Sequence, residues 1–484
     1  MARAQLGVGH ILRRAGFGAS QEDLKFFEGT STSGVLQYLL DYDQQPDDAD
    51  SKIGNSAYAS ITPGGGFSPN LNIEHARQRW LFRMVHTQRP LQEKMALFWH
   101  NHFATAYSKI AGIVGGGQAT RMMALKTGDL PGPQGQIELF RSMALGSFRD
   151  LLIEVAKDPA MLVWLDGRLN TRQRPQENFG REIMELFTIG IGNYNEQDVY
   201  AAARVFTGWN IRLINRGNDT NSYYEFVFNA NQHDTSAKTF TFPIYRDGNA
   251  TIPARAASDG MQDGIDFITA LATHPATARR LARKTWDFFV SEVVEPSPST
   301  INDAAMMYLQ NGTRIESLVH YMLRSREFQN PGNWYTRYAW PVEFVVRAVK
   351  EVGWTGFSVD TLRAPLTAMG QTLFEPPDVN GWELGQGWFS TGGMLARMNF
   401  SAALAANQRN NLALSTVDAA SSPESMLEYF LDRLSPAPFA QEARQDLLTH
   451  LEAGGAWTGS DAQRRTKAPG LTRLIVGSSE YQLM

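Results

Sequence analysis

Residues 91–103 read LQEKMALFWHNHF, a stretch in which apolar residues recur at three- and four-residue spacing. This spacing places them on one face of an amphipathic helix. The same pattern covers most of residues 1–210 and returns after residue 256, for example in HPATARRLARKTWDFFV and PVEFVVRAVKEVG. We therefore predict a mainly α fold, built as a large multi-helix bundle.

The pattern changes between residues 211 and 255, where SYYEFVFNA and KTFTFPIY alternate like strands. We expect a small β insertion there, between an N-terminal helical core (1–210) and a second helical part of the same core (256–412), followed by a C-terminal helical segment (413–484). Residues 374–389 are rich in Pro, Gly and Trp, and such a long irregular loop is ordered only if its aromatic side chains pack or bind something. The glycines at 115–117 predict a surface loop.

Composition excludes several classes of function. The 484 residues are 43% hydrophobic, which is enough for a large core, and the net charge of −4 argues against a general nucleic-acid partner. Because the chain has no cysteine, histidine and carboxylates are its only strong metal ligands. No G-x-S-x-G, H-E-x-x-H, P-loop or dinucleotide fingerprint occurs, which disfavours conventional serine hydrolases, kinases and dehydrogenases.

The sequence predicts neither membrane insertion nor export. No window approaches ~18 consecutive apolar residues, and the first twenty residues lack the apolar run of a secretory signal. As written, the chain is therefore expected to be cytoplasmic and to have no transmembrane segment. We also expect a monomer or weak dimer, because no heptad repeat or long apolar edge strand indicates an obligate interface.

Two histidines end the helical stretch quoted above. His100 follows Glu93 by seven residues and shares its helix face, whereas His102 converges with His100 only if the helix ends near Asn101. Neutral imidazole is the commonest metal ligand, so we predict that His100 and His102 bind a divalent metal, Zn, Mn or Fe. In the alternative, His100 packs in the core and His102 caps the helix or bonds to a loop carbonyl.

A second cluster lies in ENFGREIMELFTIG, residues 177–190. Glu182 and Glu185 share a helix face, and Arg181 is four residues from both Glu177 and Glu185. The two carboxylates can complete the metal site or act as acid and base, so Arg181, Glu182 and Glu185 are predicted catalytic residues. The alternative is a buried Arg–carboxylate network that fixes helix register.

Two further groups predict ligand binding. His233, Asp234 and Lys238 lie in the β insertion, where loops often carry function, although a simple turn also explains them. The other group lies in and after the Pro/Gly/Trp loop, and it consists of Trp382, Trp388 and Arg397. Indole faces with guanidinium groups are a common surface for sugars or carboxylates, and core packing of the loop is the alternative.

The motifs HILRRAGFG, EKMALFWHNHFAT, ENFGREIMELFTIGIGNYNEQDV, HPATARRLARKTWDFFV and GQTLFEPPDVNGWELGQGWF occur in this order. In these motifs the chain resembles, over almost its whole length, the bacterial family known as domain of unknown function 1800. The resemblance implies no established activity. It does imply that relatives are often exported and are encoded beside a companion protein related to sulfatases, hence envelope or polymer processing.

Several residues fall on motif positions of that family: His10, His100, His102, Glu177, Arg181, Glu182, Glu185, Trp209, His233, Asp234, Lys238, Lys284, Trp382 and Arg397. Phe187 and Met143 depart from it, since many relatives have His at these two positions. If those histidines are ligands in the relatives, a metal site in this chain is weakened.

Two functions stay open. The first is a metal-assisted hydrolase or lyase acting on an envelope polymer or saccharide, with His100, His102 and Glu182 or Glu185 around a metal that activates water. The second is a non-catalytic helical module that binds the sulfatase-like companion or another surface partner.

Overall fold

The computed structural model describes residues 3–62, 64–217 and 221–484. Within these ranges it contains 24 α-helices and two small antiparallel two-stranded sheets. The prediction of a mainly α fold with a small β insertion is therefore confirmed. None of the helices in the described ranges is long and apolar enough to cross a membrane.

The elements before residue 260 are α1 (Arg3–Arg14), α2 (Gln21–Phe26), α3 (Thr32–Leu40), α4 (Ile73–His86), α5 (Pro90–His102), α6 (Tyr107–Val114), α7 (Gly116–Ala124), α8 (Gln136–Ser142), α9 (Phe148–Lys157), α10 (Pro159–Trp164), α11 (Glu177–Glu185), α12 (Glu196–Val205), β1 (Trp209–Ile214), β2 (Tyr223–Phe228), β3 (Lys238–Thr239) and β4 (Thr251–Ile252). The later helices are α13 (Met261–Thr273), α14 (Pro275–Phe289), α15 (Pro298–Gln310), α16 (Ile315–Arg324), α17 (Arg326–Gln329), α18 (Pro341–Val352), α19 (Arg363–Ala368), α20 (Thr391–Asn407), α21 (Arg409–Ser415), α22 (Pro423–Leu434), α23 (Gln441–Glu452) and α24 (Asp461–Val476).

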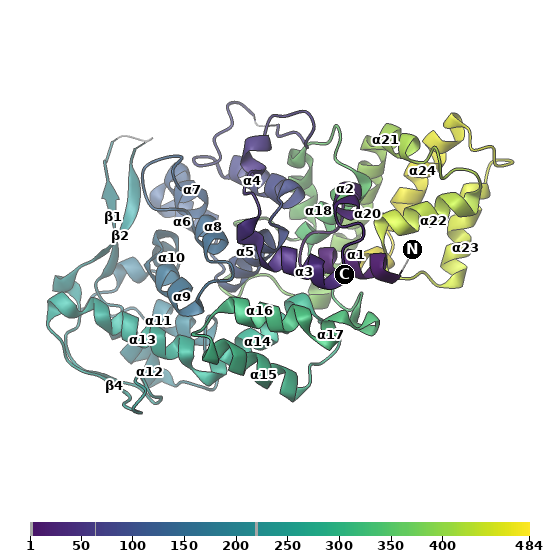
Figure 1. Ribbon diagram of the computed structural model, residues 1–484. Coiled ribbons are helices and arrows are strands. Elements are labelled where there is room, and N and C mark those ends of the chain that lie inside the picture. Colours follow the sequence, from purple (N-terminus) through teal and green to yellow (C-terminus); the bar gives the residue numbers. More distant parts are fainter. Residues whose placement is uncertain (1–2, 63, 218–220) are drawn as a thin grey trace.

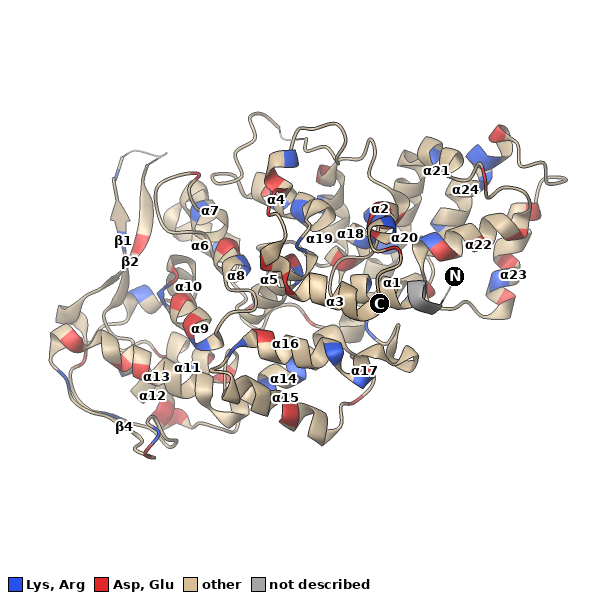
Figure 2. Cartoon of the chain, in the orientation of Figure 1, with Lys and Arg blue, Asp and Glu red and all other residues tan. Residues whose placement is uncertain are grey.

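The helices form an elongated molecule. The β1–β2 ribbon lies at one end and α21 to α24 lie at the other, with α3, α5 and α16 between them (Figure 1). Lys and Arg are interspersed with Asp and Glu over the whole length of the molecule (Figure 2). The charged residues are thus mixed, in agreement with the small net charge.

Helices α5 and α18 are buried along nearly their whole length. Lys94 of α5 forms an ion pair with Glu343 of α18, and both side chains are fully buried. Arg337 donates to the same carboxylate at 2.9 Å, and the backbone N–H of Trp340 donates to its other oxygen at 2.9 Å. A charge at this depth stabilises the fold only while its partners are present. The two helices are therefore linked by polar as well as apolar contacts.

Helix α1 connects the start of the chain to its second half. His10 Nε2 lies 3.0 Å from the carbonyl oxygen of Phe328, which is 318 residues away, and Arg14 donates to the carbonyl of Asn333 at 2.9 Å, 319 residues away. Both side chains are buried. Part of the HILRRAGFG motif therefore packs among distant segments.

The β insertion is anchored by a tryptophan. Strands β1 and β2 pair antiparallel, with Trp209 opposite Phe228 and Ile214 opposite Tyr223. The Trp209 indole packs against α13 at Gly264, where an added Cβ would lie 2.2 Å from the ring. Glycine is required there because α13 approaches the indole so closely.

The predicted loop at residues 115–117 is not found. Helix α6 ends at Val114, Gly115 has φ +86°, and α7 begins at Gly116. A single glycine with positive φ therefore makes the whole turn between two helices. Gly116 and Gly117 are exposed, as expected for a surface segment, but they form the first turn of α7, so only one residue of the predicted loop lies outside a helix.

Candidate functional site

Helix α5 ends at His102, and each of its last three residues bonds to a distant part of the chain. His100 is 1% exposed and packs among the rings of Trp80, Phe374 and Trp382. Its Nε2 accepts the backbone N–H of Phe374 at 3.0 Å. Burial lowers the pKa of His100 to about 3, so the imidazole is neutral at physiological pH.

Asn101 holds the Pro/Gly/Trp loop. Its Oδ1 accepts the backbone N–H of Trp382 at 2.8 Å. Gly381, which precedes Trp382, has φ +85°, and a Cβ at that position would lie 2.3 Å from the same oxygen. The loop therefore reaches α5 only because residue 381 is glycine.

His102 joins two other segments. Its Nε2 lies 3.1 Å from the carbonyl oxygen of Phe187, and its Nδ1 lies 3.0 Å from Lys284 Nζ. A carbonyl can only accept, so the proton is on Nε2, and Nδ1 accepts from the lysine. Burial and the nearby Lys284 and Arg280 hold the pKa of His102 well below its usual value. Phe187 thus contributes its backbone to this contact.

Lys284 lies in an unusual environment for a lysine. In the described ranges no carboxylate lies within ion-pair distance of its Nζ, and its hydrogen-bond partner is the neutral His102. Burial lowers the pKa of Lys284 to about 7, and Arg280 acts in the same direction. A large fraction of this amine is therefore uncharged near neutral pH.

The predicted cluster on α11 lies at the surface. The Arg181 side chain is 32% exposed and forms a two-pronged ion pair with Glu196, with N–O distances of 2.7 and 2.8 Å. Its contact with Glu177 is longer, at 3.4 Å. The interpretation as a buried Arg–carboxylate network was wrong, because its main partner comes from the next helix, α12, on an open face.

The two predicted catalytic carboxylates also lie on this face. Glu185 accepts a hydrogen bond from the hydroxyl of Tyr194. Glu182 is partly buried, and burial together with the neighbouring Glu185 raises the pKa of Glu182. Neither side chain has a partner on α5 among the described residues. The same helix thus contributes Glu182 and Glu185 to a partly solvated cluster.

The described ranges contain no group of three or more His, Asp or Glu side chains that could hold a metal ion. The structure therefore does not gather His100, His102, Glu182 and Glu185 into one such group. The two sets of side chains point to different parts of the molecule. The imidazoles bond to the backbone of Phe374 and Phe187, whereas the carboxylates lie on the α11–α12 face.

In the β insertion, His233 and Lys238 are fully buried around Asp263 of α13. The Asp263 carboxylate lies 2.5 Å from Lys238 Nζ and 3.2 Å from His233 Nε2. Asp234 is instead bound by Arg204 at 2.8 Å, and although burial opposes it, this contact lowers the pKa of Asp234. His233 and Lys238, both predicted to bind a ligand, thus join the β insertion to α13 and are closed to solvent.

Trp382 and Trp388 line a cavity of about 760 Å³, which we call the tryptophan cavity. Its polar lining is made of Thr367, Asp378, Asn380, Glu383 and Ser390. The Nε1 of Trp388 is buried and has no hydrogen-bond partner among the described residues. The structure thus brings together two of the three residues predicted from this loop.

Arg397 does not line the tryptophan cavity. It is fully buried, donates to Gln482 Oε1 at 2.8 Å and to the Ala339 carbonyl at 2.9 Å, and stacks on Phe344 and Phe389. Burial lowers the pKa of Arg397 to about 9. Its guanidinium therefore joins α20 to the segment before α18 and to the chain end.

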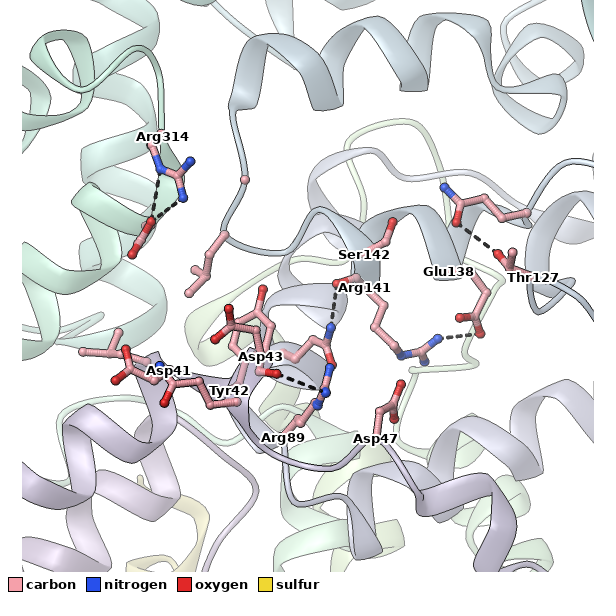
Figure 3. A pocket seen from close by; sticks show the side chains of 17 residues that line it. Asp41, Tyr42, Asp43, Asp47, Arg89, Thr127, Glu138, Arg141, Ser142 and Arg314 are labelled. Carbon is pink, nitrogen blue, oxygen red and sulfur yellow. Dashed lines mark hydrogen bonds and ion pairs between the residues drawn. The ribbon is translucent and has the colours of Figure 1, made fainter.

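A second cavity, the polar cleft, has a volume of about 710 Å³ and contains no residue that the sequence singled out as a site. Asp41, Tyr42 and Asp43 lie on one side of it and Glu138 and Arg141 on the other (Figure 3). Sequence reasoning missed the cleft because its walls come from segments scattered between residues 40 and 316, none of which carries a recognisable motif.

Comparisons with known proteins agree with the motif resemblance. A family model described as a protein of unknown function, DUF1800, matches residues 10–483. No curated protein and no solved structure matches the chain. The match covers nearly all of the 484 residues. The chain therefore belongs to the DUF1800 family of proteins of unknown function.

Proposed function

We propose that this protein is a non-catalytic binding module that holds a saccharide in the tryptophan cavity. The observation that carries the proposal is the lining itself, in which two indoles stand beside Asp378, Asn380, Glu383 and Ser390. Indole faces stack on the apolar faces of sugar rings, while carboxylate, amide and hydroxyl groups bond to sugar hydroxyls. The buried Nε1 of Trp388 is a further donor that lacks a hydrogen-bond partner among the described residues.

The fixed position of the loop supports this function. Three side chains outside the loop accept hydrogen bonds from its backbone N–H groups. His100 accepts from Phe374 at the start of the loop and Asn101 from Trp382 in the middle. Glu292 accepts from Gly385 near the end of the loop. A loop held in its binding conformation loses less entropy when a ligand binds. His100 and Asn101 thus support the tryptophan cavity by holding the loop in place.

Titration with neutral oligosaccharides of glucose and of N-acetylglucosamine, followed by calorimetry and tryptophan fluorescence, tests the proposal. We expect saturable binding that Trp388→Ala and the exposed-loop variant Asn380→Ala each weaken by about tenfold, equivalent to about 1.4 kcal/mol. Trp457→Ala is the matched control, because Trp457 lies outside the cavity and donates to the Ala420 carbonyl. Absence of binding, or equal loss in the control, contradicts the proposal.

The metal-assisted hydrolase or lyase stays a prediction with a separate test. Elemental analysis of protein purified without chelator should detect stoichiometric Zn, Mn or Fe if that prediction holds. A bound metal that Glu185→Gln removes would favour the enzyme over the binding module. The sulfatase-like companion also stays a prediction, and co-purification of the two proteins tests it.

A further inference from the structure

The polar cleft lies between the segment after α3, the starts of α5 and α16, and α8. Its lining carries five carboxylates against three guanidinium groups: Asp41, Asp43, Asp47, Glu138 and Glu316 against Arg89, Arg141 and Arg314. The cleft therefore has a surplus of two negative charges. Because narrow clefts with low-dielectric walls focus such a field, this surplus attracts cations.

Two of the guanidinium groups are paired with carboxylates. Arg141 donates to the fully buried Glu93 at 2.6 and 3.0 Å and forms an ion pair with Glu138 at 2.5 Å. Although burial opposes it, Arg141 and Arg83 lower the pKa of Glu93 to about 2, so this pair is charged at neutral pH. Arg314 pairs with Glu316 at 2.5 Å. Neither arginine therefore attracts an anion strongly.

The third guanidinium group holds the chain segment that borders the cleft. Arg89 donates from Nε to the carbonyl of Gln45 at 2.7 Å. It also donates from Nη2 to the carbonyl of Asp43 at 3.4 Å, a bond drawn in Figure 3. In the described ranges no cation lies within ion-pair distance of the exposed Asp43 carboxylate. Its negative charge is thus available to a ligand.

Gln92 supplies a second, independent feature. Its side chain lines the cleft, is 6% exposed, and donates from Nε2 to the Arg141 carbonyl at 3.0 Å. Its buried Oε1 has no hydrogen-bond partner among the described residues. Leaving a buried acceptor unpaired is unfavourable, and a ligand N–H would remove that penalty.

We propose that the polar cleft binds an organic cation that carries several ammonium groups, an oligoamine. One ammonium donates to Gln92 Oε1, and another is held by the carboxylates of Asp43 and Asp41. An ammonium group supplies an N–H donor for the unpaired Gln92 oxygen. Its positive charge also balances the surplus negative charge of the lining. A volume of about 710 Å³ accommodates a chain with more than one such group.

Other ligand classes fit the cleft less well. An anion would meet paired arginines and a net negative lining. A neutral sugar would satisfy Gln92 but leave the charge surplus unchanged. A bare metal ion lacks a ligand set, because the described ranges hold no group of three His, Asp or Glu side chains able to bind one.

Calorimetric titration of the full chain with spermidine at about 0.15 M salt, where exposed charges are screened beyond about 8 Å, tests this proposal. We expect one saturable site, weakened about tenfold by Gln92→Leu and about threefold by Asp43→Asn. Asp303→Asn is the control, because it removes one negative charge at an exposed position on α15, outside the cleft. It should leave binding unchanged. If Gln92→Leu fails to fold, the double variant Asp41→Asn with Asp43→Asn takes its place, because both residues lie near the surface in the segment after α3.

Fully acetylated spermidine provides the second comparison, because it keeps the chain length and loses the charges. It should bind at least about tenfold more weakly than spermidine. Equal binding of the two probes, equal loss in Asp303→Asn, or many weak sites in place of one would each overturn the proposal. The Trp388→Ala variant should bind spermidine normally, so failure here is distinguishable from failure of saccharide binding in the tryptophan cavity.

Discussion

The end of α5 and the exposed face of α11 both carry polar side chains that can titrate, but the two regions differ in burial. His100 and His102 are 1% and 4% exposed, and their hydrogen bonds replace water in the core. Arg181 and Glu196 have side chains that are 32% and 76% exposed, and water competes with their ion pair. Buried polar contacts are costly to break, whereas exposed ion pairs contribute about 0–1 kcal/mol. The two regions therefore differ in how deeply their polar side chains are buried, although their sequences suggested one shared site.

His100→Ala should produce the largest loss of stability. It opens a cavity among three rings and leaves the Phe374 N–H without its acceptor, so we expect unfolding to become easier by about 3–5 kcal/mol. Urea denaturation of wild type and variant measures this. A loss below about 1 kcal/mol would show that the two regions do not differ as their burial indicates.

Asp158→Asn should have an intermediate effect that depends on pH. Asp158 is buried at the start of α10, where it accepts from Met161 N at 3.0 Å and Gln136 Nε2 at 2.8 Å. Burial raises the pKa of Asp158 to about 7, above the unfolded value of about 3.9. The folded state therefore holds the proton more tightly, and this stabilisation is lost as the pH rises from about 4 through 7.

The asparagine variant keeps the helix cap but cannot ionise, so it should gain about 2 kcal/mol over wild type on going from pH 5 to pH 8. Melting curves at the two pH values measure the difference. Asp150→Asn, an exposed carboxylate on the preceding helix, should show no such gain. Parallel curves for wild type and Asp158→Asn would contradict the prediction.

Arg181→Ala should have the smallest effect. The pair with Glu196 is exposed, so a double-mutant cycle with Glu196→Ala should give a coupling close to zero that falls further in high salt. A buried network would instead lose about 3–5 kcal/mol on removal of one partner. A coupling of that size would remove the contrast between the two regions.

Much of the fold could be predicted because helical and strand patterns are local. The three- and four-residue spacing in residues 91–103 corresponds to α5, and the alternation in SYYEFVFNA corresponds to β2. Gly116 and Gly117 were mispredicted as loop, since the low helix propensity of glycine does not exclude it from the exposed first turn of a helix. The candidate sites were harder, because a site requires convergence of distant segments. Trp382 and Trp388 were found from one loop, whereas the polar cleft, assembled from several, was missed.

The sequence by itself determined the helical class, the place of the β insertion and membership of the family, because periodicity and motif order are properties of the chain alone. Only the tertiary structure decided which polar residues are buried, which are solvated and which border a cavity. His100 bonds to a residue 274 positions later, and Arg181 has its main partner on another helix. Burial depends on what packs over a side chain, and those packing partners lie far away in the sequence.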